Sequence, residues 1–169
     1  MPAAPTIFVL DSNVLIEAAR RYYQLAFAMP FWTGLLTNGQ SGRVLSVDAV
    51  LNELSNGNDQ LKIWAENDFR SYFMTTDTAE VISSYSTLIN WVQAEQQYLQ
   101  RAKDRFMEFD NADSWVLAFA HAKGYKVVTQ EVASPDVKKN IPIPNVCQAF
   151  SIPYCNTFEM IAELGITFQ

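Results

Sequence analysis

Residues 6–13 read Thr6-Ile7-Phe8-Val9-Leu10-Asp11-Ser12-Asn13. The apolar run from Ile7 to Leu10 is typical of a strand buried on both faces of a parallel sheet. It ends at the carboxylate of Asp11, and the residues that follow predict a helix capped by Ser12 or Asn13. A strand, an acid and a helix in succession are how open α/β sheets place functional groups. The alternative interpretation is that Asp11 is only a helix cap.

The composition predicts one well-packed domain over residues 1–169. Hydrophobic residues make up 49% of the chain and charged residues only 18%, which excludes a disordered tail protein. The formal net charge of −6 argues against binding of nucleic acid by bulk electrostatic attraction. We therefore expect any contact with RNA or DNA to be local and to pass through cations bound to acidic side chains.

The chain has two cysteines, Cys147 and Cys155, and a single histidine, which argues against a zinc site. We expect both cysteines to be buried free thiols in a reducing cytoplasm. The N-terminus lacks the pattern of a signal peptide. Two uncharged segments, 22–42 and 140–158, are interrupted by Pro, Gly, Gln and Asn, so neither predicts a membrane span. We expect a soluble, cytoplasmic protein.

Strands and helices alternate along the rest of the chain, which predicts the α/β class. We expect strands at 44–47, 73–76 and 125–129, and helices at 31 to about 38, 49–54, 58–70, 77–109 (with a break near 95–97), 113–123 and 157–164. The aromatic segment from Tyr22 to Leu36 is typical of a core, and part of it is a candidate surface for a protein partner or a homodimer.

Acidic residues recur close to the predicted carboxyl ends of the strands. Asp11 and Glu131 follow strands, Glu53 lies in the helix after the second strand, and Asp113 begins the helix before the strand at 125–129. Right-handed crossovers place all these ends along one edge of a parallel sheet, so we expect the four acids to converge. Converging carboxylates repel one another unless a cation neutralises them, and oxygen ligands without Cys or His suit Mg²⁺ or Mn²⁺. Such a site activates water and cleaves phosphodiesters.

The densest group of positive charges is Arg101, Lys103 and Arg105, in the second half of the predicted helical region 77–109. Two interpretations are open for this group. It is either a solvated helix face or a set of phosphate contacts for a nucleic acid.

Four short motifs resemble those of PIN-domain nucleases, in the same order. They are Leu10-Asp11-Ser12-Asn13, Val50-x-x-Glu53-Leu54, Ala112-Asp113-x-x-x-Leu117-Ala118-x-Ala120 and Val128-Thr129-x-Glu131. The C-terminal stretches 143–147 and 156–160 resemble the DUF4411-type branch of PIN-like proteins, which is related to VapC toxins. The resemblance implies a three-layer α/β/α domain with a central parallel sheet and an Mg²⁺- or Mn²⁺-dependent endoribonuclease site. It also implies a toxin of a type II toxin–antitoxin pair, with an RNA substrate and an antitoxin partner.

By the same resemblance, Asp11, Glu53 and Asp113 match the metal-binding acids, and Asn13 matches the polar residue beside the first. Position 131 departs from the family pattern, which more often has Asp there. The longer Glu131 favours an outer, water-mediated ligand. Asp110 has no firm counterpart and is an auxiliary acid, since it precedes Asp113 by three residues.

Two other function classes remain open. A phosphotransferase of the haloacid dehalogenase type needs a second Asp two residues after the first, where this chain has Asn13. The other alternative is a catalytically inert PIN-like protein that acts as a protein- or RNA-binding module. Metal-dependent nuclease activity that is lost on changing a single acid distinguishes the nuclease from both.

Overall fold

The computed structural model describes residues 2–168, and its centre is a five-stranded parallel sheet in the order β3-β2-β1-β4-β5. The strands are β1 (Phe8–Leu10), β2 (Val44–Val47), β3 (Phe73–Met74), β4 (Lys126–Val128) and β5 (Tyr154–Cys155). The central strand β1 is fully buried, as the apolar run predicted. Its Phe8 lies opposite Val44 of β2 on one side and Lys126 of β4 on the other.

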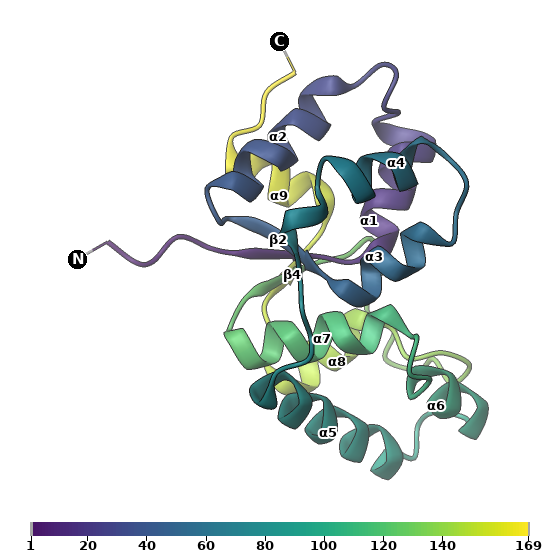
Figure 1. The fold of residues 1–169 in the computed structure, drawn as a ribbon. Helices are drawn as coiled ribbons and strands as arrows, with labels where there is room; N and C mark the ends of the chain where they lie inside the picture. Colours follow the sequence, from purple (N-terminus) through teal and green to yellow (C-terminus); the bar gives the residue numbers. More distant parts are fainter. Residues whose placement is uncertain (1, 169) are drawn as a thin grey trace.

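Helices cover both faces of the sheet, so the predicted three-layer α/β/α arrangement is confirmed (Figure 1). On one side lie α1 (Ser12–Glu17), α2 (Met29–Gln40), α3 (Asp48–Ser55), α4 (Gln60–Asn67) and α9 (Thr157–Leu164). On the other lie α5 (Ala79–Ala94), α6 (Gln100–Phe106), α7 (Ala112–Lys123) and α8 (Ile143–Phe150). The remaining helical segments are the π-helix η1 (Ala18–Tyr22), which continues α1, and the 3₁₀-helix η2 (Arg70–Tyr72).

The strand order contains a topological switch point between β1 and β4. From β1 the chain moves outward to β2 and β3, then crosses to the other face through α5, α6 and α7 and returns as β4. Connections leaving the carboxyl ends of β1 and β4 therefore diverge to opposite faces of the sheet. In open α/β sheets this divergence leaves a crevice where ligands bind.

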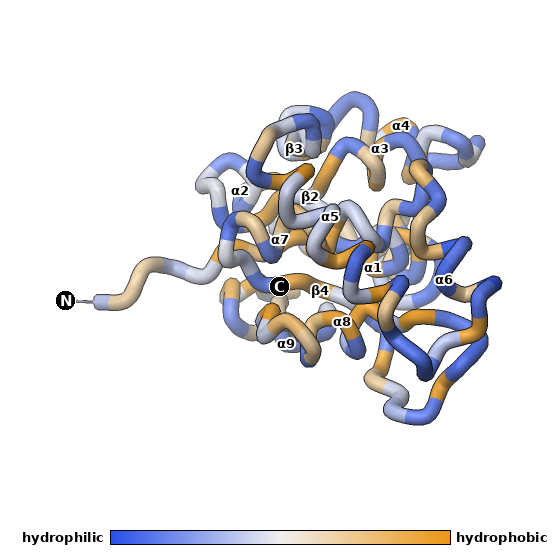
Figure 2. Tube along the Cα trace, turned by 90° about the horizontal axis from the view of Figure 1, so that it is seen from below, coloured by the Kyte–Doolittle hydropathy of each residue, from blue (hydrophilic) through white to orange (hydrophobic). Residues whose placement is uncertain are grey.

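The aromatic segment expected to form core does so over α2. Phe31, Trp32 and Leu35 are buried, and the indole of Trp32 donates a hydrogen bond to the Tyr23 carbonyl at 2.6 Å. Figure 2 shows hydrophobic residues along β4 and α8, and hydrophilic residues on α6. Phe27 remains largely exposed, so the segment contributes both core and surface.

One sequence prediction needs correction at a helix start. The N-cap of α1 is Asp11, and not Ser12 or Asn13, which already belong to the helix. The expected break in the helical region 77–109 is confirmed, since the region forms two helices, α5 and α6, separated by residues 95–99. The helix α8 and the edge strand β5 were not predicted individually, because both are short and lie in a stretch interrupted by prolines.

Both cysteines are buried free thiols, as expected. Burial raises the pKa of Cys147 to about 12 and that of Cys155 to about 11, so neither thiol is ionised near neutrality. Within residues 2–168, each helix is too short or too polar to cross a lipid bilayer.

Candidate active site

Asp11 lies at the carboxyl end of β1 and has no solvent exposure. Its backbone N–H donates to the carbonyl of Val128 at 3.0 Å, which extends the pairing of β1 with β4. Its carboxylate accepts a hydrogen bond from the Thr129 hydroxyl at 3.2 Å and makes no capping bond to α1. The interpretation of Asp11 as only a helix cap is therefore wrong. Its side chain is directed to the β4 side of the switch point.

The surroundings of Asp11 oppose its ionisation. Burial raises its pKa well above the ordinary value, and the charges of Asp113, Glu131 and Glu53 raise it further. The hydrogen bond from Thr129 acts in the opposite direction and lowers this pKa. The three other predicted acids therefore lie close enough to Asp11 for their charges to raise its pKa.

Asp113 belongs to the first turn of α7. The Asn111 side chain caps this helix by accepting a hydrogen bond from the Asp113 N–H at 2.9 Å, which fixes the position of the acid. Burial raises the pKa of Asp113 to about 7, with further increases from the charges of Glu131 and Glu53. A hydrogen bond with Asp11 and the charge of Arg105 lower this pKa by smaller amounts.

Glu131 is bound from two sides. Its backbone N–H donates to the Thr129 hydroxyl oxygen at 3.1 Å, and its carboxylate accepts the N–H of Ile143, the first residue of α8, at 2.6 Å. Burial raises the pKa of Glu131, and the bond to Ile143 lowers it. The longer side chain, which departs from the family pattern, thus reaches a helix start and fastens α8 to the site.

A pocket of about 590 Å³, called here the acidic pocket, collects most of the predicted site residues. Its walls include Asn13, Glu53, Asp110, Asp113 and Glu131. Ser12 also lines it, and the buried Asp11 lies behind this wall. Residues that the sequence analysis missed include the amides of Asn52, Asn56, Asn111 and Asn140, together with Lys139.

The three predicted phosphate-binding residues separate in the structure. Arg105 lines the acidic pocket, whereas Arg101 and Lys103 do not. The ammonium of Lys103 donates instead to the Gln93 carbonyl at 3.1 Å. The second cation at the pocket is Lys139, from the loop between β4 and α8. A signal for it was available in the sequence, since Lys138 and Lys139 follow Glu131 within eight residues.

The donor set fits Mg²⁺ or Mn²⁺. Every candidate ligand is a carboxylate or amide oxygen, and the ionisation of Asp11 and Asp113 is opposed by burial and by neighbouring charges. A divalent cation at this place would supply the missing compensation. Within residues 2–168, no three acidic, His or Cys side chains already stand together as a closed ligand set. Binding therefore requires side-chain adjustment around the pocket.

The model of one protein family matches residues 8–168, and its description is "Domain of unknown function (DUF4411)". The chain belongs to the DUF4411 family. This assignment agrees with the resemblance of the C-terminal motifs. No curated protein matches the chain significantly.

Two solved structures share the fold of this DUF4411 protein. One is VapBC2 from Rickettsia felis bound to a DNA fragment from their promoter, with a TM-score of 0.53 and 14% identity, covering 89% of this chain and 98% of that one. The other is FitAcB from Neisseria gonorrhoeae, with a TM-score of 0.52 and 17% identity, covering 90% of this chain and 99% of that one. At these identities the likeness shows that this chain shares its fold with the two structures.

We expect the stability of the metal-free protein to fall as pH rises from about 4 to about 7. The pKa of Asp113 is raised from 3.8 to about 7 on folding, so the folded state holds its proton more tightly than the unfolded chain. This stabilisation is complete below the unfolded pKa and is lost as pH rises through the folded pKa. Urea unfolding with a chelator at pH 5 and pH 8 measures the difference. The variant Asp113→Asn should reduce it, and an equal pH dependence in this variant would contradict the assignment.

We expect Glu131→Asp to lower the free energy of unfolding by roughly 1 to 3 kcal/mol, because the shorter side chain loses its charged hydrogen bond to the Ile143 N–H. The matched variant Glu131→Gln keeps an acceptor oxygen at the same reach and should lose less. Denaturant unfolding of the metal-free variants measures both changes. Equal stability of Glu131→Asp and wild type would show that this bond does not hold α8.

Proposed function

We propose that this DUF4411 protein is an Mg²⁺- or Mn²⁺-dependent endoribonuclease that cuts RNA phosphodiester bonds. The observation that carries the proposal is electrostatic. Asp11, Glu53, Asp113 and Glu131 come from four different parts of the chain, yet the charges of the other three each raise the pKa of Asp11. A buried acid whose ionisation is opposed by half-buried and exposed acids around it is typical of a functional site that binds a cation.

Each side chain has a role that follows from its position. Asp11 and Asp113 would hold the metal, with Glu53 and Glu131 at its periphery, and Thr129 orients the Asp11 carboxylate through its hydroxyl. When bound, the metal supplies an activated water and neutralises charge on the phosphate oxygens. The amide of Asn13 and the carboxylate of Asp110 lie on the pocket wall, where they position that water or the substrate.

Two cations complete the pocket. Arg105 and Lys139 lie on its wall, where they bind the phosphates on either side of the cleaved bond. This local arrangement answers the objection raised by the net charge of −6, since a few cations in a pocket are enough to place a polyanion.

The biological role we propose is that of the toxin in a type II toxin–antitoxin pair. The support is the resemblance of the four motifs to PIN-domain toxins and the fold shared with VapBC2 and FitAcB. A cognate antitoxin is the expected protein partner, and the cytoplasm is the expected compartment. A homodimer is a further expectation.

A catalytically inert PIN-like module is the second candidate. The observation in its favour is that Glu131 already binds the Ile143 N–H, which leaves fewer carboxylate oxygens free for a metal. The two candidates share the fold and the pocket, but the inert module would bind RNA or a protein without cutting RNA.

We expect Mn²⁺ or Mg²⁺ to raise the melting temperature and to support cleavage of single-stranded RNA, because a ligand that binds only the folded state stabilises it. Asp11→Asn and Asp113→Asn should each lose most of the thermal shift and at least about a hundredfold in cleavage rate. Asp68→Asn, an exposed carboxylate beyond α4, is the control and should keep both. A metal-dependent thermal shift without cleavage in wild type would favour the inert module.

We expect Arg105→Ala and Lys139→Ala to weaken RNA binding, because each removes one phosphate contact. The slope of log K against log salt should flatten by about one for each variant. Turnover of bound RNA should change much less, since the metal ligands remain. Arg101→Ala and Lys103→Ala remove equal charge outside the acidic pocket and are the matched controls. Equal effects from all four variants would show that the acidic pocket has no special role and that the cations of α6 form only a solvated charged face.

A further inference from the structure

Two further pockets adjoin the acidic pocket, one on each side. The first, the Tyr22 pocket, shares Asn13 and Glu131 with the acidic pocket and has a volume of about 890 Å³. The second, the Phe109 pocket, shares Asn52 and Asp110 with it and has a volume of about 450 Å³. Shared walls make the three pockets one continuous surface with the acids at its centre.

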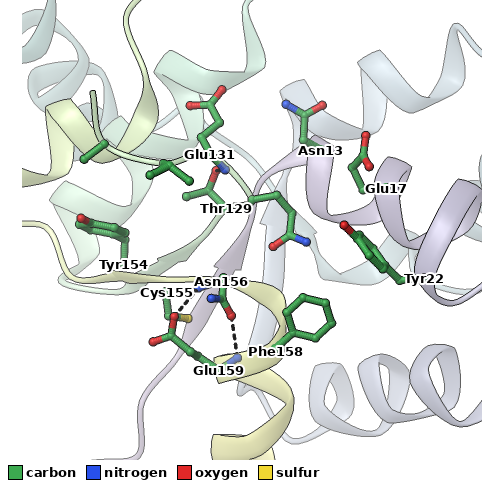
Figure 3. A pocket seen from close by; sticks show the side chains of 13 residues that line it. Asn13, Glu17, Tyr22, Thr129, Glu131, Tyr154, Cys155, Asn156, Phe158 and Glu159 are labelled. Carbon is green, nitrogen blue, oxygen red and sulfur yellow. Dashed lines mark hydrogen bonds between the residues drawn. The ribbon is translucent and has the colours of Figure 1, made fainter. Parts of the chain in front are cut away.

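The outer pockets present aromatic rings to solvent. In the Tyr22 pocket the rings of Tyr22 and Phe158 are 51% and 48% exposed and meet edge to face, with centroids 5.5 Å apart. Figure 3 shows Glu131 and Asn13 along one edge of this pocket, Tyr22 and Phe158 further round it, and Tyr154 across from Tyr22. The rings of Tyr22 and Phe158 therefore lie beyond the wall that the Tyr22 pocket shares with the acidic pocket.

The Phe109 pocket contains a more exposed ring. Phe109 is 85% exposed and lies directly before Asp110 of the acidic pocket. The ring of Trp115 stands edge to face with it, with centroids 6.2 Å apart, and stacks on Tyr85 at 4.0 Å. The indole of Trp115 also donates to the Phe109 carbonyl at 3.0 Å. Phe109 thus contacts the ring of Trp115, which itself stacks on Tyr85, while most of the Phe109 ring stays open to a ligand.

Charge is divided among the three pockets. The cations Arg105 and Lys139 line only the acidic pocket. The polar residues of the other two are neutral or acidic, among them Glu17, Gln130 and Glu159 in the Tyr22 pocket and Asp48 and Asp77 in the Phe109 pocket. Such groups repel phosphates, but they accept hydrogen bonds from the amino groups of nucleobases. The centre suits phosphate and the two sides suit bases.

We propose that the Tyr22 and Phe109 pockets each bind an unpaired nucleobase of the RNA strand whose phosphates cross the acidic pocket. This inference rests on the proposed function, because it takes RNA as the ligand of that pocket. Bases stack on exposed rings only when they are unpaired, so the arrangement selects single-stranded segments and excludes intact duplex. Any of the four bases can stack on these rings, so the pockets do not select a base sequence. They select the strand because it is single-stranded.

Binding and cleavage are measured separately so that the two proposals are tested independently. Binding is followed by the fluorescence anisotropy of a labelled eight-nucleotide adenosine RNA with Asp113→Asn, which lacks a proposed metal ligand and should leave the RNA uncut. Added to this background, Phe109→Leu and Tyr22→Leu should each weaken affinity about five- to a hundredfold, the range for loss of one stacked base. Phe109→Trp and Tyr22→Phe keep a ring and should retain affinity. Phe27→Leu is the matched control, since Phe27 is 84% exposed and lines none of the three pockets.

A fully abasic strand of equal charge and a duplex hairpin complete the test, and melting temperatures confirm that each variant is folded. Both ligands should bind more weakly than the adenosine strand and should not distinguish Phe109→Leu from its background. Unchanged RNA affinity in both leucine variants would overturn the inference and assign the rings to a protein contact. Ring-dependent RNA binding without cleavage in wild type would support the inference and defeat the proposed nuclease. Cleavage by wild type, together with RNA binding that does not depend on the rings, would support the proposed nuclease and overturn the inference.

Discussion

The Asp11 carboxyl group is withdrawn from solvent at the end of the central strand, and the rest of the site is arranged around it. Strand β1 pairs on both sides and is fully buried, so Asp11 cannot turn toward water without disturbing the centre of the sheet. A buried carboxylate without a compensating charge is costly, and its protein partners here are the Thr129 hydroxyl and, more weakly, that of Ser12. It therefore either keeps a proton or acquires a cation. The raised pKa values of Asp11 and Asp113 show that the protein without a cation favours the protonated form of both groups.

Thr129 and Glu131 connect the carboxyl group of Asp11 to helix α8 through hydrogen bonds. One threonine hydroxyl donates to Asp11 and accepts from the N–H of Glu131, whose carboxylate in turn accepts from the start of α8. These hydrogen bonds link the carboxyl group of Asp11 to the first residue of α8. Glu131 therefore both holds α8 in place and lines the acidic pocket.

Local charge resolves the apparent conflict between an acidic chain and a polyanionic ligand. Arg105 and Lys139 come from α6 and from the loop before α8, and both reach the acidic pocket. Lys103 and Arg105 are close in sequence but not in space, because residues two apart on a helix point to different sides. Lys103 accordingly binds the carbonyl of Gln93 in the last turn of α5, while Arg105 lines the acidic pocket.

The sequence by itself determined the buried central strand, the alternation of strands and helices, and the acids near the ends of the strands. These depend on local patterns, since a buried apolar strand followed by Asp11, or a capped helix that begins near Asp113, is recognisable within a few residues. Only the tertiary structure decided that Asp11 is buried behind the pocket wall, that Glu131 fastens α8, and that Lys139 joins Arg105. It also decided that Tyr22 lies in a pocket next to the acids, whereas Phe109 already precedes Asp110 in the sequence. Each of these depends on contacts between segments far apart in the chain, which no local periodicity encodes.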